Sequence, residues 1–181
     1  MGRASVKPNK SIYQQTREHL GLTRERAAET LEGLTEDRIE KIENGRAMLR
    51  PEDVLIMAKG YKAPALRNYY CANECPIGRN NVAQVTLTDL PQIVLQMLAS
   101  LSALQKKRDV LIDITNDGQI QDEEIPDFVK IQEELDHMAM TVEAMRLWSE
   151  QMLAEGKINM ALYEQIKRNR SDESISPITA G

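Results

Sequence analysis

Several residue types and patterns that define large classes of protein are scarce or missing in this chain of 181 residues. It has two cysteines and two histidines, and the histidines, His19 and His137, lie far apart, so a single chain offers no complete zinc site. No segment reaches the roughly 18 consecutive apolar residues that span a bilayer, and the first residues lack the apolar segment of a signal peptide. We therefore expect a cytoplasmic protein with no membrane association.

The short motifs that are typical of enzyme active sites are also missing. The sequence contains no Gly-rich phosphate loop, no nucleophile elbow, and no histidine spaced to pair with a carboxylate. Two histidines in different parts of the chain provide little acid–base machinery. We expect no enzymatic activity and no cofactor.

An excess of positive charge is missing as well. The formal net charge is −5; residues 1–10 contribute +3, residues 11–69 are neutral, and residues 70–181 contribute −8. A protein without a basic excess binds the nucleic-acid backbone weakly through nonspecific electrostatics. Any such binding would need a local basic patch, helped by the basic arm of residues 1–10.

What the first half does contain is the pattern of a small all-α domain. Thr23 and Thr35 each precede an apolar periodic run and suit the N-cap position. Asn44-Gly45 is typical of a helix end, and Pro51 suits the first turn of another helix. The five expected helices cover about 12–20, 23–31, 35–42, 51–59 and 64–69.

A set of stretches in these helices is more specific: Gly21-Leu22-Thr23, Ala28, Ile39 with Ile42-Glu43-Asn44-Gly45, and the helix 51–59. Together they resemble the Xre/Cro-repressor family of helix-turn-helix proteins over about residues 11–69. The resemblance implies an all-α domain whose third helix enters the major groove of an operator, usually as a homodimer. It thus implies a sequence-specific, repressor-like regulator of transcription that binds double-stranded DNA.

The chain departs from that family pattern in two places. Glu32 and Gly33 both stand in the turn where one residue is typical, which could rotate the third helix. The exposed early positions of that helix carry Glu36, Asp37 and Glu40 instead of residues that donate to base edges. Carboxylates are repelled by phosphates, although they can accept a hydrogen bond from the cytosine amino group.

Candidate DNA contacts remain despite these departures. The threonines begin helices whose N-termini could hold a phosphate, and the basic residues could donate to phosphates or bases. For any single arginine, the alternative is that it only solvates an outer face. The six candidates are Thr23, Arg24, Thr35, Arg38, Lys41 and Arg46.

Residues 89–169 predict a long antiparallel helical hairpin with a shorter third helix. Apolar residues recur at spacings of four and three from Leu90 to Leu111 and from Phe128 to Met152, and the third helix follows Gly156. Two seams bury little surface, so the hairpin should pack on its own third helix, the N-terminal domain or a second copy. We favour a homodimer through the C-terminal helices, because helix-turn-helix proteins span two half-sites.

The loop of this hairpin matches the spacing of an EF-hand calcium loop. Its candidate ligands are Asp113, Thr115, Asp117, Gln119 and Glu124. A structural explanation competes, because Asp117-Gly118 is a common turn and Asp122 could cap the helix that follows. We favour that explanation and predict no metal site.

The remaining segments connect or flank these domains. A linker, 70–88, contains Cys71 and Cys75, which could form a disulfide or half of a four-thiolate zinc site across a dimer. Since the cytoplasm keeps thiols reduced, we expect buried free cysteines. The first ten residues should form a flexible arm, and the polar tail 170–181 should be disordered.

Two functions follow from the sequence. The first is a DNA-binding regulator that acts as a dimer. The second is a protein-interaction module on a helix-turn-helix scaffold, which does not bind DNA and uses its acidic third helix and C-terminal hairpin to bind another protein. The acids Glu36, Asp37 and Glu40 distinguish the two.

Overall fold

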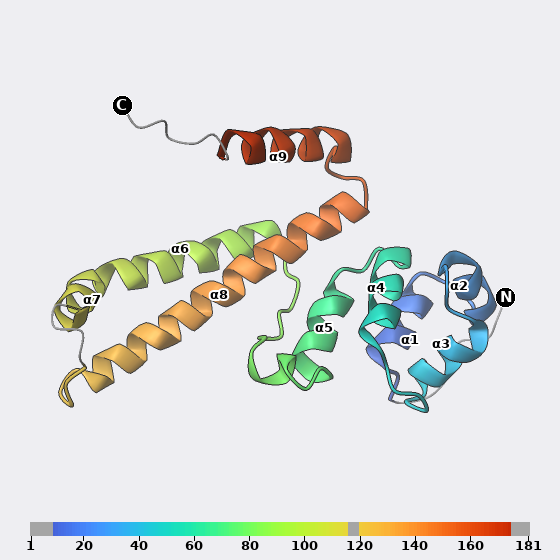
Figure 1. The fold of residues 1–181 in the computed structure, drawn as a ribbon, viewed down its shortest axis with the longest axis horizontal. Coiled ribbons are helices and arrows are strands. Elements are labelled where there is room, and N and C mark those ends of the chain that lie inside the picture. Colours follow the sequence, from blue (N-terminus) through green and yellow to red (C-terminus); the bar gives the residue numbers. More distant parts are fainter. Residues whose placement is uncertain (1–8, 116–119, 175–181) are drawn as a thin grey trace.

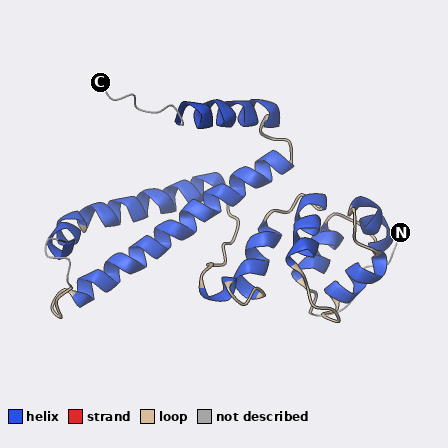
Figure 2. Ribbon diagram, in the orientation of Figure 1, coloured by secondary structure: helices blue, strands red, loops and turns tan. Residues whose placement is uncertain are grey.

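The structure is a computed structural model that describes residues 9–115 and 120–174. Within these ranges every regular element is a helix (Figure 2), so the predicted all-α class is confirmed. The elements, in order, are α1 (Ile12–His19), α2 (Arg24–Thr30), α3 (Glu36–Glu43), α4 (Pro51–Gly60), α5 (Ala65–Asn73), the 3-10 helix η1 (Gly78–Asn80), α6 (Leu90–Lys106), α7 (Arg108–Thr115), α8 (Ile125–Ala154) and α9 (Met160–Ser174).

Local capping explains where the first helices begin and end. The hydroxyls of Thr23 and Thr35 accept hydrogen bonds from the backbone N–H groups of Arg26 and Arg38, each at 3.2 Å, as the N-cap prediction requires. At the end of α3, Gly45 adopts the left-handed conformation with φ +65°, whereas Asn44 does not. The helix stop therefore depends on the glycine of the Asn-Gly pair.

Helices α1 to α5 share one apolar core and gather at one end of the molecule (Figure 1). Burial of these side chains is the main favourable contribution to the stability of this domain. The core residues are Tyr13, Ala27, Leu31, Leu34, Ile39, Ile42, Val54, Met57, Ala58, Tyr61 and Leu66.

The turn between α2 and α3 is well packed. Leu31 and Leu34, at its two ends, are 1% and 5% exposed. Between them, Gly33 takes φ +98°, a conformation that L-residues rarely adopt. A glycine therefore provides the backbone conformation that this turn requires, and both ends of the turn lie in the core.

Helix α5 extends further than the sequence predicts. It continues to Asn73, so Cys71 lies on its last turns and not in the linker. On the same helix, the buried amide of Asn68 donates to Ala83 O at 3.1 Å and accepts from Val85 N at 2.9 Å. This side chain fastens the extended segment after η1 to the N-terminal domain.

The predicted hairpin is formed mainly by α6 and α8, which run side by side (Figure 1). The first arm breaks at Lys107, next to the Arg108 that interrupts its apolar stripe, and continues as α7. The second arm begins at Ile125 with Glu124 at the N-cap position, so the expectation that Asp122 caps it is wrong. The hairpin core is narrow and contains Ile93, Ser100, Ile131, Thr141, Ala144 and Leu147.

Two polar contacts attach the hairpin to the N-terminal domain. Arg67 on α5 forms an ion pair with Glu150 on α8, and Gln151 donates to Lys62 O at 3.1 Å. No described helix has the length and apolar character needed to cross a membrane.

Three sequence predictions fall partly outside the described residues. Residues 1–8 of the expected arm and 175–181 of the expected tail lie there, as do positions 116–119 of the hairpin loop. Of the parts that are described, Lys10 donates to Glu18 at 2.6 Å. Helix α9 runs to Ser174, so the expected disorder from residue 170 is wrong for 170–174.

The Asn68 contacts lead to a first prediction. Replacing Asn68 by Ala should lower the free energy of unfolding by about 1–3 kcal/mol, because it leaves the partner backbone groups unpaired. Hydrogen exchange at Val85 should accelerate. The matched control is Asn73→Ala, since that partly exposed amide bonds only within its own helix, to Tyr69 O. Equal exchange at Val85 in both variants would contradict the assignment.

Candidate nucleic-acid interface

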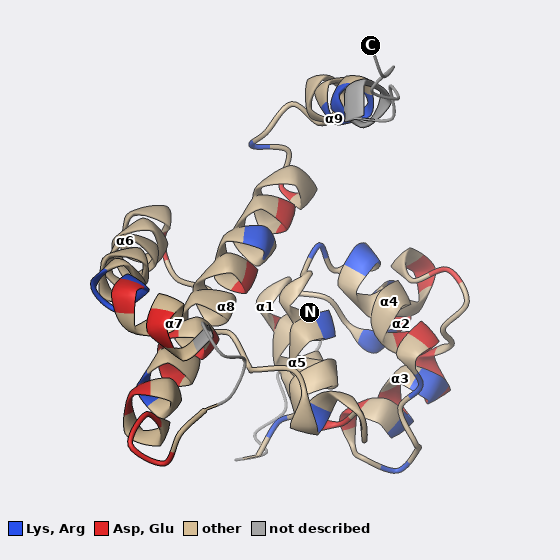
Figure 3. Cartoon of the chain, turned by 60° about the vertical axis from the view of Figure 1, so that its left-hand side comes forward, with Lys and Arg blue, Asp and Glu red and all other residues tan. Residues whose placement is uncertain are grey.

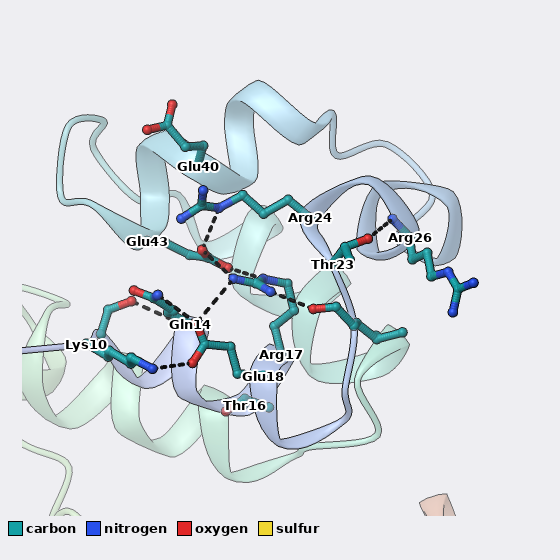
Figure 4. A network of polar contacts seen from close by, with 12 residues as sticks. Lys10, Gln14, Thr16, Arg17, Glu18, Thr23, Arg24, Arg26, Glu40 and Glu43 are labelled. Carbon is teal, nitrogen blue, oxygen red and sulfur yellow. Dashed lines mark hydrogen bonds and ion pairs between the residues drawn. The ribbon is translucent and has the colours of Figure 1, made fainter. Parts of the chain in front are cut away.

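A buried ion pair joins the first and third helices beneath the candidate interface. Arg17 on α1 donates through Nε to Glu43 Oε1 at 2.5 Å and through Nη2 to Oε2 at 2.9 Å. Its remaining Nη1 donates to Leu22 O at 2.6 Å, in the turn before α2. The Arg17 side chain is 7% exposed and that of Glu43 is 0% exposed, so the arginine fixes three segments relative to one another (Figure 4).

Helix α2 is tied to the same carboxylate. Arg24 donates through Nε to Glu43 Oε2 at 2.8 Å, and Figure 4 shows its guanidinium over Glu43. Hydrogen bonds to Glu43 raise the pKa of Arg17, against the lowering effect of burial. Glu43 thus holds α1, α2 and α3 together through charged hydrogen bonds, which are stronger than neutral ones.

Arg38, a predicted DNA contact, is turned toward the protein. Its guanidinium forms an ion pair with Asp53 on α4 and donates to Met48 O at 2.8 Å. Burial opposes ionisation of Asp53, but hydrogen bonds from Arg38 and from the Arg50 amide outweigh burial and lower the pKa of the carboxyl. Arg38 therefore positions the start of α4 on α3.

The other two basic candidates on this surface are exposed but paired. Lys41 donates to Asp37 at 2.7 Å, and Arg46 donates to Glu40 at 3.2 Å. The side chains of Lys41 and Arg46 are 48% and 66% exposed. Surface pairs of this kind contribute at most about 1 kcal/mol, so a phosphate could compete for either cation.

The first residue of α2 and the first turns of α3 line a shallow hollow. The hollow has a volume of about 470 Å³ and is lined by Arg24, Thr35, Glu36, Asp37 and Glu40. Three of the five lining residues are acidic. In helix-turn-helix folds, the helices corresponding to α2 and α3 are the pair that contacts DNA.

Arg26 is a candidate that the sequence analysis missed. It lies in the first turn of α2, is exposed, and in Figure 4 points away from the Glu43 network. Among the described residues, no carboxylate forms an ion pair with it, in contrast to Arg24 and Lys41. The signal was its position three residues after the Thr23 N-cap, beside the free N–H groups of the helix.

The structure gives the six predicted residues different roles. Thr23 and Thr35 cap helices, which leaves further N–H groups at each terminus for a phosphate. Arg24 and Arg38 are structural, while Lys41 and Arg46 remain at the surface. Arg17 and Glu43 are the pair that sequence reasoning undervalued; the signal was a Glu placed directly after the core residue Ile42.

No metal centre is assembled in the described part of the chain. There, no three His, Cys, Asp or Glu side chains come together as ligands. Of the candidate calcium ligands, Asp113 lies on α7, Thr115 ends it, and Glu124 accepts from Gln121 N at 2.8 Å. Asp117 and Gln119 lie outside the described residues.

The cysteines differ from the expectation in one respect. Cys71 and Cys75 are both free, as predicted, but both are partly exposed and not buried. Cys71 lines a cavity of about 780 Å³ between α5, the segment after η1, and α8. Their partial exposure corrects the expectation of buried thiols.

Comparison with known proteins identifies the N-terminal region. Residues 14–68 match the family model described as "Helix-turn-helix domain". No curated protein and no solved structure matches the chain at a significant level. The match confirms a helix-turn-helix domain, the fold of many DNA-binding regulators; the Xre/Cro type stays a prediction.

The buried ion pair generates a second prediction. Replacing Glu43 by Gln should lower the free energy of unfolding by about 3–5 kcal/mol, because Arg17 is left charged in the interior. Urea unfolding measures the effect. The control Glu40→Gln breaks an exposed pair and should cost less than about 1 kcal/mol. Similar losses in the two variants would show that the pair does not organise the domain.

The Arg38–Asp53 pair generates a pH prediction. Because the folded pKa of Asp53 lies below its ordinary value of 3.8, the pair stabilises the fold fully above that pH and less as pH falls toward the folded pKa. The stability difference between wild type and Asp53→Asn should therefore shrink below about pH 4. Asp37→Asn, at a 68% exposed side chain, is the control. A difference for Asp53→Asn that does not change with pH would contradict the assignment.

Proposed function

We propose that this protein is a sequence-specific DNA-binding regulator of transcription that acts as a dimer and represses by occupying an operator. The observation that carries the proposal is the helix-turn-helix domain at residues 14–68, with α3 held by Glu43 against α1 and α2. In such a domain α3 enters the major groove, and the N-terminus of α2 meets the backbone.

The charge distribution favours binding by two copies. The basic side chains on the DNA-facing side are mostly paired with carboxylates, and the acidic colour in Figure 3 extends over α3 and along α8. One domain therefore gains little nonspecific affinity from phosphates. Two domains on a palindrome would add their phosphate contacts and restore useful affinity.

The acidic hollow supports a particular way of reading bases. Glu36, Asp37 and Glu40 surround the site where a base edge would meet the protein. A carboxylate there accepts a hydrogen bond from the cytosine N4 amino group and repels the acceptor-rich edge of guanine. We infer that the operator half-site contains cytosine opposite these acids.

A second function is favoured by the same acids. If α3 binds a protein and not DNA, its exposed carboxylates fit a basic partner surface. The ion pairs of Lys41 with Asp37 and of Arg46 with Glu40 then need not be broken by phosphates. In that case the domain is a protein-interaction module. The two functions make opposite predictions for binding to duplex DNA.

Selection from a random duplex pool at about 50 and 200 mM salt tests the proposal. We expect an enriched palindrome whose half-sites lie about one helical turn apart. Lys41→Ala and Arg26→Ala should each weaken binding to the enriched duplex and lower the salt slope by about one. Lys130→Ala, which removes an exposed cation from α8, is the matched control and should bind as wild type.

Two design points keep the result interpretable. Arg38 is not replaced, because its loss would disturb the Asp53 contact and the fold. Glu36→Gln with Asp37→Asn should change the preferred base at one position per half-site. No enrichment at the lower salt, from protein with a helical circular dichroism spectrum, would refute DNA reading and favour the interaction module.

A further inference from the structure

The hairpin exposes an apolar face on the side away from the linker. On α6, Val94, Leu98 and Leu101 follow one stripe at spacings of four and three and are 36%, 56% and 48% exposed. On α8, Leu135 and Val142 are seven residues apart and are 48% and 54% exposed. We call these five residues the hairpin face.

The opposite side of the hairpin is already occupied. The segment 84–88 covers it and encloses a cavity of about 650 Å³, with Ala99 and Ala103 of α6 and His137 of α8 in its lining. On α6, Ala99 and Ala103 each lie two residues from Leu101 of the exposed stripe, so they point to the opposite side of the helix. Of these two sides of the described hairpin, one is covered by the segment 84–88, and the hairpin face is covered by no described segment.

Helix α9 also has an apolar stripe that no other described part of the chain covers. Its described side chains are all exposed, and Figures 1 and 3 both show it apart from the hairpin. Leu162 and Ile166, one turn apart, are 52% and 51% exposed. A helix of 15 residues is marginally stable in water without tertiary packing, so this stripe needs a partner.

The placement of α9 turns that stripe away from its own chain. Met160 and Glu164, one turn apart, line a groove of about 680 Å³ with Leu55 of α4 and Leu153 of α8. Leu162 and Ile166 are offset by two residues from this pair and so lie on the other side of the helix. Before α9, Gly156 takes φ +73° and ends α8, which lets the chain leave the hairpin.

Charge favours an encounter of α9 with a hairpin. Helix α8 carries six carboxylates and two basic residues, whereas α9 carries three of each, with its three basic residues gathered at 167–170. The basic cluster, Lys167, Arg168 and Arg170, lies next to Ile166 in the sequence. Attraction between this basic cluster and the acidic α8 speeds the association of the two helices and favours one orientation.

We propose that α9 of each chain packs its Leu162–Ile166 stripe on the hairpin face of a second copy, so that two chains exchange their last helices. The exchange is reciprocal, as a two-fold symmetric dimer requires. It rests on the proposed function in that it supplies the dimer with which the two helix-turn-helix domains reach two half-sites.

The test is the mass of the full chain in solution as a function of concentration. Wild type should be a dimer, and Leu162→Glu with Ile166→Glu should raise the dimer dissociation constant at least about a hundredfold, because two apolar contacts are lost to charges. The control replaces Met48 and Ile77, 88% and 78% exposed, by Glu, and should remain dimeric. Circular dichroism verifies that every variant is helical.

A mixing experiment separates exchange from other arrangements. Leu98→Glu with Leu101→Glu should also give monomers, but mixing this variant with the α9 variant should restore a heterodimer, since one intact α9 then meets one intact hairpin face. A wild-type monomer, a dimer that survives the α9 substitutions, or a mixture that stays monomeric would each overturn the exchange.

The result can be distinguished from that of the DNA experiment. A chain that enriches an operator but keeps its dimer after the α9 substitutions would refute the exchange and leave the regulator standing. A dimer that dissociates as predicted but enriches no duplex would support the exchange and refute DNA reading.

Discussion

The hydrogen-bonded charges around Glu43 are the interaction on which the N-terminal domain depends. One buried carboxylate receives Arg17 from α1 and Arg24 from α2 while sitting at the end of α3. Burial of apolar side chains stabilises the domain but does not fix the angles between helices. Charged hydrogen bonds require a defined geometry and therefore do. The angle at which α3 is presented, on which any groove-reading function relies, is therefore set beneath the surface and not by the exposed residues.

Local signals in the sequence are sufficient to predict the helices but not the ion pairs between them. Thr23, Thr35 and Gly45 mark helix ends through contacts within a few residues, so they could be recognised without a structure. The ion pair between Arg38 and Asp53 joins residues 15 apart, and that between Arg17 and Glu43 joins residues 26 apart. Such pairs depend on how helices cross, which no periodicity encodes, and so the sequence alone does not reveal that Arg38 faces Asp53.

The same limit applies to the hairpin. Its apolar spacing correctly predicted two long helices, but a stripe does not say how much of itself a partner covers. Ile93 and Ile131 are buried between α6 and α8, whereas Leu101 and Leu135 of the same stripes remain about half exposed. A sequence with wider apolar stripes than one hairpin can cover is typical of a chain that completes its core with another.

We propose that α3, with the first turn of α2, is the surface that meets DNA. An amide NMR titration of the full chain with the duplex that it selects tests this most directly. We expect the amide shifts to concentrate at residues 23–26 and 35–41 and to weaken as salt is raised. Shifts confined to the hairpin or to α9, or no shifts from a folded protein, would contradict it.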